Sequence, residues 1–381
     1  MGMTDKNTPI EIIGDTSEAY IAQLTKSLHE ANTLLIEKER VVQFQHALIQ
    51  QQLEELEKKQ KLKEEMLVFF YCFRPFLLPL MWLVRPVYRL LKPRLGILSQ
   101  YPPQELQIPS KYDRKFSLSI APKISIVTPS FNQSEFIERT LKSVLDQSYP
   151  NLEFYVQDGG SEDGTAEVLR RYADRLSGWV SCSDTGQSQA INFGFAKTSG
   201  EIMAWLNSDD ILLPGALAYV AEYFVRHPEV DVVYGHRFLI DENDQDIGRW
   251  MMPPHDDQIL SWADFIPQET MFWRRRIWEK AGGKIDETLH FAIDWDLLLR
   301  FREAGARFAR VGRFLGGFRI HSQQKTSAEK PIGFQEMSWI RESTLGHVPS
   351  SDEIAKAVFP YLLKHVVTDL GWRIRKKLWL W

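Results

Sequence analysis

The chain has 381 residues, of which 44% are hydrophobic and 25% are charged, as in a folded globular protein of about two to three domains. Its 46 basic and 50 acidic side chains leave a net charge of −4, which excludes a global polycation for nucleic acid. Two cysteines, Cys72 and Cys182, are too few for a disulfide framework or a four-cysteine zinc site. Residues 1–18 are polar and acidic and lack the order of a secretory signal, so export is not expected.

Residues 17–65 contain neither proline nor glycine, and they predict one long helix after a flexible segment over residues 1–16. Six apolar residues repeat at strict seven-residue spacing: Ile21, Leu28, Leu35, Val42, Ile49 and Leu56. The other apolar position of the heptad is filled only in the first two repeats. This pattern predicts a coiled coil that makes the protein a homo-oligomer and weakens toward its C-terminal half. The alternative is a single amphipathic helix packed on the domain that follows.

Residues 66–94 are apolar and aromatic, with five basic residues and no acid among them. Arg74 and three prolines interrupt the apolar run, which falls short of the ~20 residues that a spanning helix needs. Arginines interleaved with aromatic side chains are typical of a segment in the headgroup region of an anionic membrane. We therefore expect residues 66–110 to be a membrane-proximal linker, with a true span or a cover for the next domain as alternatives.

The last part of the chain, residues 326–381, predicts a helical tail. Its residues 362–381 contain five basic residues and one acid, together with Trp372, Trp379 and Trp381. Tryptophan beside lysine and arginine is typical of a membrane interface, so we expect this tail to contact the membrane. A tryptophan tucked into a groove of the protein is the alternative.

Between these flanks, residues 111–325 alternate expected strands and helices. The strands are Lys123–Thr128, Leu152–Val156, Trp179–Ser181 and Ile202–Leu206, and Asn132 resembles the cap of the first helix. This alternation predicts an α/β fold with a mainly parallel sheet that is flanked by helices. Ligands of such sheets bind beyond the C-terminal ends of the strands.

Three acidic clusters stand at such positions. Asp158 follows the second strand, residues 207–210 (NSDD) follow the fourth, and Asp294 opens a helix. Carboxylates at a strand end suit Mg²⁺ or Mn²⁺ that also contacts phosphate oxygens. Taken singly, the three could be a turn rich in Asp and Gly, a helix cap and a partner of the helix dipole.

Together, the order and spacing of these clusters resemble the family 2 inverting glycosyltransferases of the GT-A fold, of the bacterial polysaccharide and O-antigen type. The resemblance covers residues 123–321, through stretches such as ISIVTPSFNQSEF, VQDGGSEDGT, IMAWLNSDD, IPQETMFW and FAIDWDLLLRF. It implies that Asp158 contacts the base of a nucleotide, with Pro129 and Ser130 beside it. It also implies that Asp184 and Asn192 line the nucleotide pocket.

The same resemblance implies that Asp294 is the catalytic base and that Asp209 binds a metal, with His321 near the metal and the diphosphate. Asn207 stands where the family has the first acid of its DxD motif, and Ser208 stands between the two positions. The substitution removes one negative charge, so metal binding is expected to depend mainly on Asp209, with Asp210 or His321 assisting.

The function that follows is an inverting transfer of a sugar from a nucleotide-diphosphate donor, with UDP as the expected nucleotide. The acceptor would be a hydroxyl of a lipid-linked or polysaccharide molecule in cell-envelope glycan synthesis. A divalent metal would assist, and the enzyme would sit at the cytoplasmic face of the cell membrane as a peripheral protein. The alternative is a catalytically inactive coiled-coil scaffold of a membrane-bound polysaccharide assembly, although a scaffold has no need of the three acids.

Overall fold

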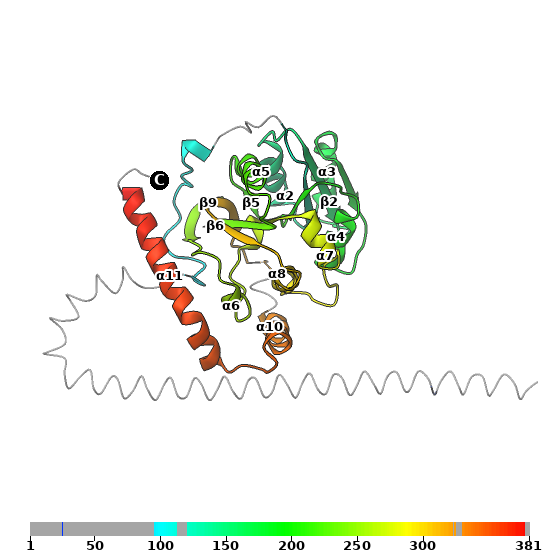
Figure 1. Cartoon of the computed structure of the whole chain (residues 1–381). Helices are drawn as coiled ribbons and strands as arrows, with labels where there is room; N and C mark the ends of the chain where they lie inside the picture. The colour runs from blue at the N-terminus through cyan, green and yellow to red at the C-terminus, as the bar shows by residue number, and fades with distance from the viewer. Residues whose placement is uncertain (1–24, 26–94, 113–119, 323, 325–329, 378–381) are drawn as a thin grey trace, which may run out of the picture. The chain divides into compact units, whose positions relative to one another are not determined.

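The computed structural model describes Thr25 and residues 95–112, 120–322, 324 and 330–377 (Figure 1). The chain divides into two units, Met1–Tyr88 and Arg89–Trp381, and all described residues except Thr25 belong to the second unit. The predicted coiled coil and the membrane-proximal segment over residues 66–94 therefore lie outside the described residues, apart from Thr25, and stay predictions.

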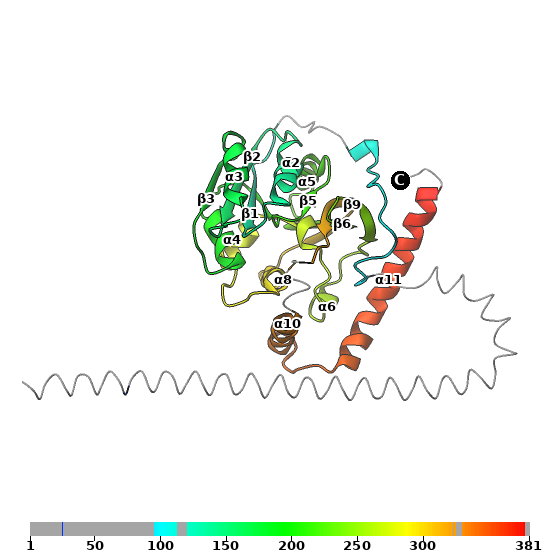
Figure 2. The same ribbon diagram turned by 180° about the vertical axis from the view of Figure 1, so that it is seen from behind.

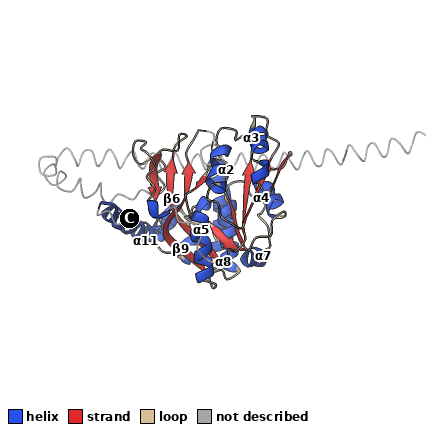
Figure 3. Ribbon diagram, turned by 90° about the horizontal axis from the view of Figure 1, so that it is seen from above, coloured by secondary structure: helices blue, strands red, loops and turns tan. Residues whose placement is uncertain are grey.

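One sheet of nine strands organises the second unit (strands red, helices blue in Figure 3). Its strands are β1 (Ile124–Ser130), β2 (Leu152–Asp158), β3 (Gly178–Ser181), β4 (Ile202–Trp205), β5 (Ile211–Leu212), β6 (Val232–Ile240), β7 (Asp246–Trp250), β8 (Phe272–Arg274) and β9 (Phe308–Arg319). The order across the sheet is β3-β2-β1-β4-β8-β6-β9-β5, and β7 also pairs with β6.

The sheet is mixed, so the expectation of a mainly parallel sheet is wrong for one half of it. The strands β3, β2, β1 and β4 are parallel, as predicted. Beyond β4, the short β8 runs antiparallel to both of its neighbours, and β7 folds back on β6 as an antiparallel hairpin. In that half, only β6 and β9 are parallel neighbours.

Successive residues of a strand point to opposite faces of the sheet, and helices cover both faces. Ile202 and Ala204 of β4 belong to one core cluster, whereas Met203 and Trp205 belong to another. The first cluster is covered by α2 (Ile137–Leu145), α3 (Thr165–Arg171) and α5 (Ala216–Arg226). The second is covered by α4 (Gln187–Phe195), α7 (Arg275–Lys280) and α8 (Ile293–Glu303) (Figures 1 and 2).

The remaining helices are α6 (Asp257–Leu260), α10 (Lys330–Leu345) and α11 (Ser351–Lys377), with short 3₁₀ turns at Ser110–Tyr112, Ala173–Arg175 and Gln268–Thr270. Residues 100–104 run beside β7, where the backbone N–H of Gln104 bonds the carbonyl of Asp246 at 3.1 Å. Among the described residues, no helix is long and apolar enough to cross a membrane.

Trp372 of α11 packs inside the protein instead of lying at the surface. It is 6% exposed, its ring lies 4.0 Å from the Arg249 guanidinium, and it meets Phe314 of β9 edge-on. For Trp372 the structure therefore shows the alternative to membrane contact, a tryptophan tucked into a groove of the protein. Trp379 and Trp381 lie outside the described residues.

Candidate active site

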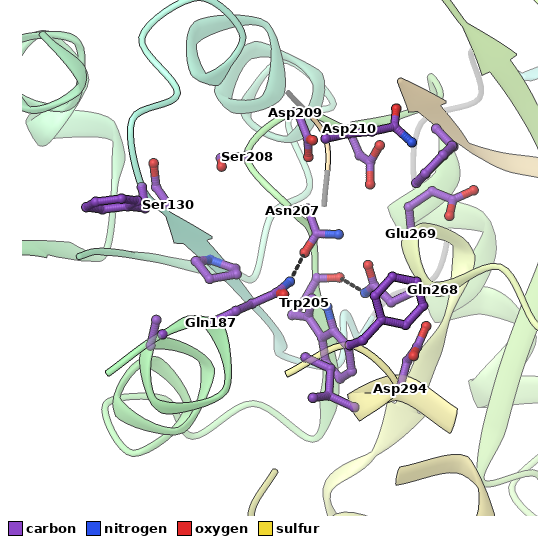
Figure 4. A pocket seen from close by; sticks show the side chains of 18 of the residues that line it. Ser130, Gln187, Trp205, Asn207, Ser208, Asp209, Asp210, Gln268, Glu269 and Asp294 are labelled. Atoms are coloured by element: carbon purple, nitrogen blue, oxygen red, sulfur yellow. Dashed lines mark hydrogen bonds between the residues drawn. The ribbon is translucent and has the colours of Figure 1, made fainter. Parts of the chain in front are cut away.

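A cavity of about 730 Å³ opens where β1 and β4 end and where α8 begins. Seven of the ten predicted site residues line it: Pro129, Ser130, Asp184, Asn207, Ser208, Asp209 and Asp294. In Figure 4, Asp209 and Asp210 lie on one side of the cavity and Asp294 on the other, with Asn207 and Gln268 between them. The structure thus brings together acids that are far apart in the sequence. Asp158, Asn192 and His321 do not line this cavity.

Asp158 is fully buried and holds a turn beside the cavity. Its carboxylate accepts hydrogen bonds from the backbone N–H of Ser161 (2.9 Å), the hydroxyl of Ser161 (2.5 Å) and the hydroxyl of Ser181 (2.6 Å). The next residue, Gly159, does line the cavity, and a Cβ there would lie 3.1 Å from the Asp184 carboxylate. Asp158 therefore shapes the edge of the cavity through the turn that it fixes.

The loop after β1 is tied to the same turn. Asn132 has a left-handed backbone (φ 51°), donates its N–H to the hydroxyl of Ser161 and accepts at Oδ1 from the N–H of Glu162. The interpretation of Asn132 as a helix cap is therefore wrong, because α2 begins only at Ile137. Its side chain joins two loops of the site.

Asp184 and Asn192 have different surroundings. Asp184 lines the cavity and accepts from the N–H of Gly186 at 2.9 Å. Burial raises the pKa of the Asp184 carboxyl above its ordinary value, against the lowering effect of that bond. Asn192 bonds both the N–H and the carbonyl of Ile285, so it anchors α4 to the loop before α8.

The loop after β4 is held from behind, which fixes the side chains that it presents. Thr140 of α2 donates its hydroxyl to the carbonyl of Ser208 (2.8 Å) or to that of Asp210 (2.7 Å). The Oδ1 atom of Asp210 accepts from the N–H of Arg319 at 2.9 Å. At the front, Gln187 of α4 donates to Oδ1 of Asn207 at 2.8 Å (Figure 4).

Asp209 and His321 form a close pair. Oδ2 of Asp209 and Nε2 of His321 lie 3.0 Å apart, and the imidazole packs against the ring of Phe136. Carboxylate oxygen and imidazole nitrogen are both ligands of divalent transition metals. Among the described residues, no group of three or more His, Cys, Asp and Glu is placed to hold a metal. The pair thus fits a metal that takes its remaining ligands from water or from a bound diphosphate.

Sequence reasoning missed the polar residues deeper in the cavity, starting with Arg237. This residue is 9% exposed, and its guanidinium lies 4.2 Å from the ring of Trp250 and 4.7 Å from that of Phe318. Its Nε lies 3.4 Å from Oε1 of Glu269, which is 2% exposed. The aromatic rings hold the cation at the cavity wall, where it faces several acids.

Two of these acids have raised pKa values. Burial and the nearby Asp294 raise the pKa of the Asp264 carboxyl well above its ordinary value, and they also raise that of Glu269. The positive charge of Arg237 opposes both shifts. Glu269 stands in the IPQETMFW stretch, which is the only signal that the sequence offered for it. Asp264 has no such signal.

Several buried polar atoms of cavity-lining residues have no hydrogen-bond partner in the described part of the chain. Among them are Oδ2 of Asp210, Oε1 of Gln268 and the indole Nε1 of Trp205. Unpaired buried polar atoms are rare in folded proteins and call for a ligand or water. Their presence in one cavity indicates a site for a polar ligand or for ordered water.

The start of α8, which carries Asp294, is held by a residue that the sequence did not reveal. Glu336 of α10 is 2% exposed and accepts from the N–H groups of His290 (2.7 Å), Phe291 (2.8 Å) and Ala292 (2.9 Å). Asp294 itself accepts from the N–H of Trp295 at 3.0 Å. A carboxylate so placed in a partly closed cavity can take a proton from a bound hydroxyl group.

Comparison with known proteins agrees with this geometry. The model described as glycosyl transferase family 2 matches residues 125–302. An uncharacterized glycosyltransferase of Nostoc sp. is 29% identical over 172 residues, which are 42% of this chain and 53% of that protein. The O-antigen biosynthesis protein RfbC of Myxococcus xanthus is 29% identical over 221 residues, which are 57% of this chain and 17% of that protein.

A putative teichuronic acid biosynthesis glycosyltransferase of Bacillus subtilis is 37% identical over 92 residues, 23% of this chain and 36% of that protein. The chain thus spans about half the length, or less, of these three relatives. Among solved structures, S. aureus TarS 1–349 in complex with UDP-GlcNAc is similar in fold, with a TM-score of 0.50 and 17% identity over 64% of this chain and 73% of that one. Residues 125–302 thus match the glycosyl transferase family 2 model, and this stretch contains every predicted site residue except His321.

Proposed function

We propose that this chain is an inverting glycosyltransferase that moves a sugar from a nucleotide-diphosphate donor to a hydroxyl of a lipid-linked or polysaccharide acceptor. The observation that carries the proposal is the single cavity that joins the loop at residues 207–210 to Asp294. The names of the relatives from Myxococcus xanthus and Bacillus subtilis support a role in cell-envelope glycan synthesis. UDP is the nucleotide that we expect.

The nucleotide would bind at the end of the cavity formed by Pro129, Ser130, Gly159 and Asp184. Glycine at position 159 leaves the backbone open to close approach by a ligand. In the described conformation Asp158 fixes this turn and does not line the cavity, so contact with the base would require the turn to move.

The diphosphate would lie at the loop after β4, where Asp209 and His321 would hold Mg²⁺ or Mn²⁺. When bound, such a cation neutralises the negative charge that builds on a departing diphosphate. Asn207 is uncharged, and Gln187 fixes its carbonyl oxygen, so its amide nitrogen can donate to a phosphate oxygen. The loop thus offers a hydrogen-bond donor where the family has a carboxylate.

Asp294 would act as the general base. Its carboxylate takes the proton of the acceptor hydroxyl while that oxygen attacks the anomeric carbon, opposite the departing diphosphate. A single displacement of this kind inverts the anomeric configuration. Glu336 would act as a positioning residue, because it fixes the backbone that leads into α8.

The N-terminal predictions complete the proposal. The heptads over residues 17–65 would join chains into a homo-oligomer, and residues 66–94 would hold the enzyme at the cytoplasmic face of the cell membrane as a peripheral protein. This placement would bring the cavity to a lipid-linked acceptor.

The test is a screen of the purified full-length chain with a panel of nucleotide sugars and Mn²⁺, following nucleotide release and the anomeric configuration of the product. Asp294→Asn should lower turnover by about 10²–10⁴ while calorimetry shows nearly unchanged nucleotide binding. Asp296→Asn is the matched control, because Asp296 lies on the same helix but pairs with Arg300 at 2.8 Å. If the Asp294→Asn variant kept more than half of the activity of the unchanged enzyme, Asp294 would not be the general base. If the unchanged enzyme turned over no donor, the inactive scaffold would be favoured.

A further inference from the structure

The helix α11 has a buried side and, opposite to it, an exposed row of apolar residues. Its inner side carries Tyr361, His365, Asp369 and Trp372, all less than 9% exposed. A second row, which we name the α11 stripe, comprises Phe359, Leu363, Val367 and Ile374, which are 56%, 50%, 70% and 51% exposed. At 3.6 residues per turn the two rows lie on opposite sides of the helix, and the stripe extends over about 22 Å.

The inner side fixes the direction in which the stripe faces. His365 bonds the carbonyl of Met251 at 2.9 Å, and Lys364 bonds Asp256 at 2.9 Å. Trp372 stacks on the guanidinium of Arg249, whose Nε lies 3.5 Å from Asp369. The helix therefore cannot roll to bury the stripe without breaking these contacts. In Figures 1 and 2, α11 lies at the margin of the described domain.

The charges on α11 are mostly basic. The helix contains six basic residues and three acids. Asp352 and Glu353 stand in its first turn, before the stripe begins, and Asp369 is turned inward and pairs with Arg249 and Arg373. Arg375 is exposed, and the sequence continues as Leu-Trp-Leu-Trp over residues 378–381. An apolar row with basic residues at its end is typical of a helix that lies in the plane of an anionic bilayer.

We infer that the α11 stripe docks on the surface of a bilayer that contains anionic lipid. A second copy of the chain is a poorer occupant, because a stable protein interface takes about 20–30 residues from each side and the stripe offers four. Both Met251 and Arg249, on which α11 packs, are neighbours of Trp250 in the cavity wall. Docking would thus hold the cavity at a fixed distance from the bilayer, and this last step rests on the proposed use of a lipid-linked acceptor.

An environment-sensitive fluorophore can test the docking in the full-length chain. We would attach it to Val367→Cys in a background with Cys72→Ser and Cys182→Ser. The matched control is Val180→Cys, because Val180 is an exposed valine on β3, at the end of the sheet away from β9. Vesicles with phosphatidylglycerol should shift the emission of the probe at position 367 to the blue and leave the control unchanged. No shift at position 367, or a blue-shifted emission before vesicles are added, would overturn the inference.

A charge in the stripe gives an independent reading. Because residues 66–94 are also proposed to bind the bilayer, the reading here is the local probe and not the bound fraction. Phe359→Glu with Leu363→Glu should lower the blue shift of the probe at position 367 at least threefold, whereas Val180→Glu should leave it unchanged. Turnover with a soluble acceptor should stay unchanged, because neither Phe359 nor Leu363 lines the cavity. An undiminished blue shift in the double variant would overturn the inference. A blue shift at position 367 in a protein that transfers no sugar would support the docking and contradict only the proposed function.

Discussion

Replacing Glu336 by glutamine tests how the start of α8 is held in place. Its carboxylate accepts three backbone N–H groups, from His290, Phe291 and Ala292, directly before the helix begins at Ile293. Ala292, at the N-cap position, has no side chain that could accept a bond from the first turn. Glu336 therefore does for α8 what a capping side chain does in other helices, although it comes from α10.

The structure gives the size of the expected effect. Oε2 accepts two of the three bonds and Oε1 accepts the third, so a glutamine oxygen can keep at most the pair. Its NH₂ group would then face another N–H. The loss of one bond to a charged group costs about 1.5–3 kcal/mol, and the two that remain become neutral and weaker. We expect a total loss of about 3–5 kcal/mol from an unfolding free energy of about 5–15 kcal/mol.

Urea denaturation and steady-state turnover measure the two consequences of Glu336→Gln. The midpoint should fall, and kcat should fall more than nucleotide binding does, because the displaced segment leads into Asp294 and not into the nucleotide end of the cavity. Glu342→Gln is the matched control, since Glu342 is an exposed glutamate on the same helix. A Glu336→Gln variant with the midpoint and turnover of the unchanged protein would refute the reasoning, as would an equal loss in the control.

Three further predictions concern the metal, the buried acid Asp264 and the N-terminal segment. Asp209→Ala should weaken nucleotide-diphosphate binding in Mn²⁺ more than Asn207→Ala, because a charged ligand loses more; equal losses in calorimetry, or full activity in EDTA, would contradict this. The raised pKa of Asp264 means that the folded state keeps this proton to higher pH than the unfolded chain, so the unfolding free energy should fall as pH rises from about 4 toward the folded pKa. Asp264→Asn should remove that fall in a denaturation series, and parallel curves for the two proteins would refute it. Deleting residues 1–65 should turn a homo-oligomer into a monomer, and a monomeric full-length chain in light scattering would contradict the coiled coil.

The parallel half of the sheet could be predicted because its strands are local units. Each of β1, β2 and β4 is a short apolar run followed by a turn and a helix, and each pairs with a strand of the same pattern. The other half depends on distant pairs. β6 joins β9 in parallel and β8 in antiparallel orientation, across chain segments that contain other helices. A pairing of that kind leaves no periodic signal in the sequence.

The same distinction separates the predicted site residues from those that were missed. Asp158, Asp209 and Asp294 follow strands or open a helix within recognisable stretches, so their types and spacing could be identified. Glu336 could not, because its three acceptor bonds exist only once α10 has folded back on the segment before α8, more than 40 residues earlier in the chain. Arg237 was missed for a similar reason, since only the fold stacks it between Trp250 and Phe318.

At Asn207 the sequence lacks the first acid of the DxD motif. The structure shows how the candidates to replace that negative charge, Asp210 and His321, are placed. Asp210 was one candidate: its Oδ1 is bound to the N–H of Arg319, and its Oδ2 is buried without a hydrogen-bond partner among the described residues. His321 was the other, and its Nε2 already lies 3.0 Å from Oδ2 of Asp209. We therefore expect a metal at this loop to be held first by the carboxylate of Asp209 and the imidazole of His321. Because imidazole is a poor ligand for Mg²⁺, this donor set favours Mn²⁺ over Mg²⁺.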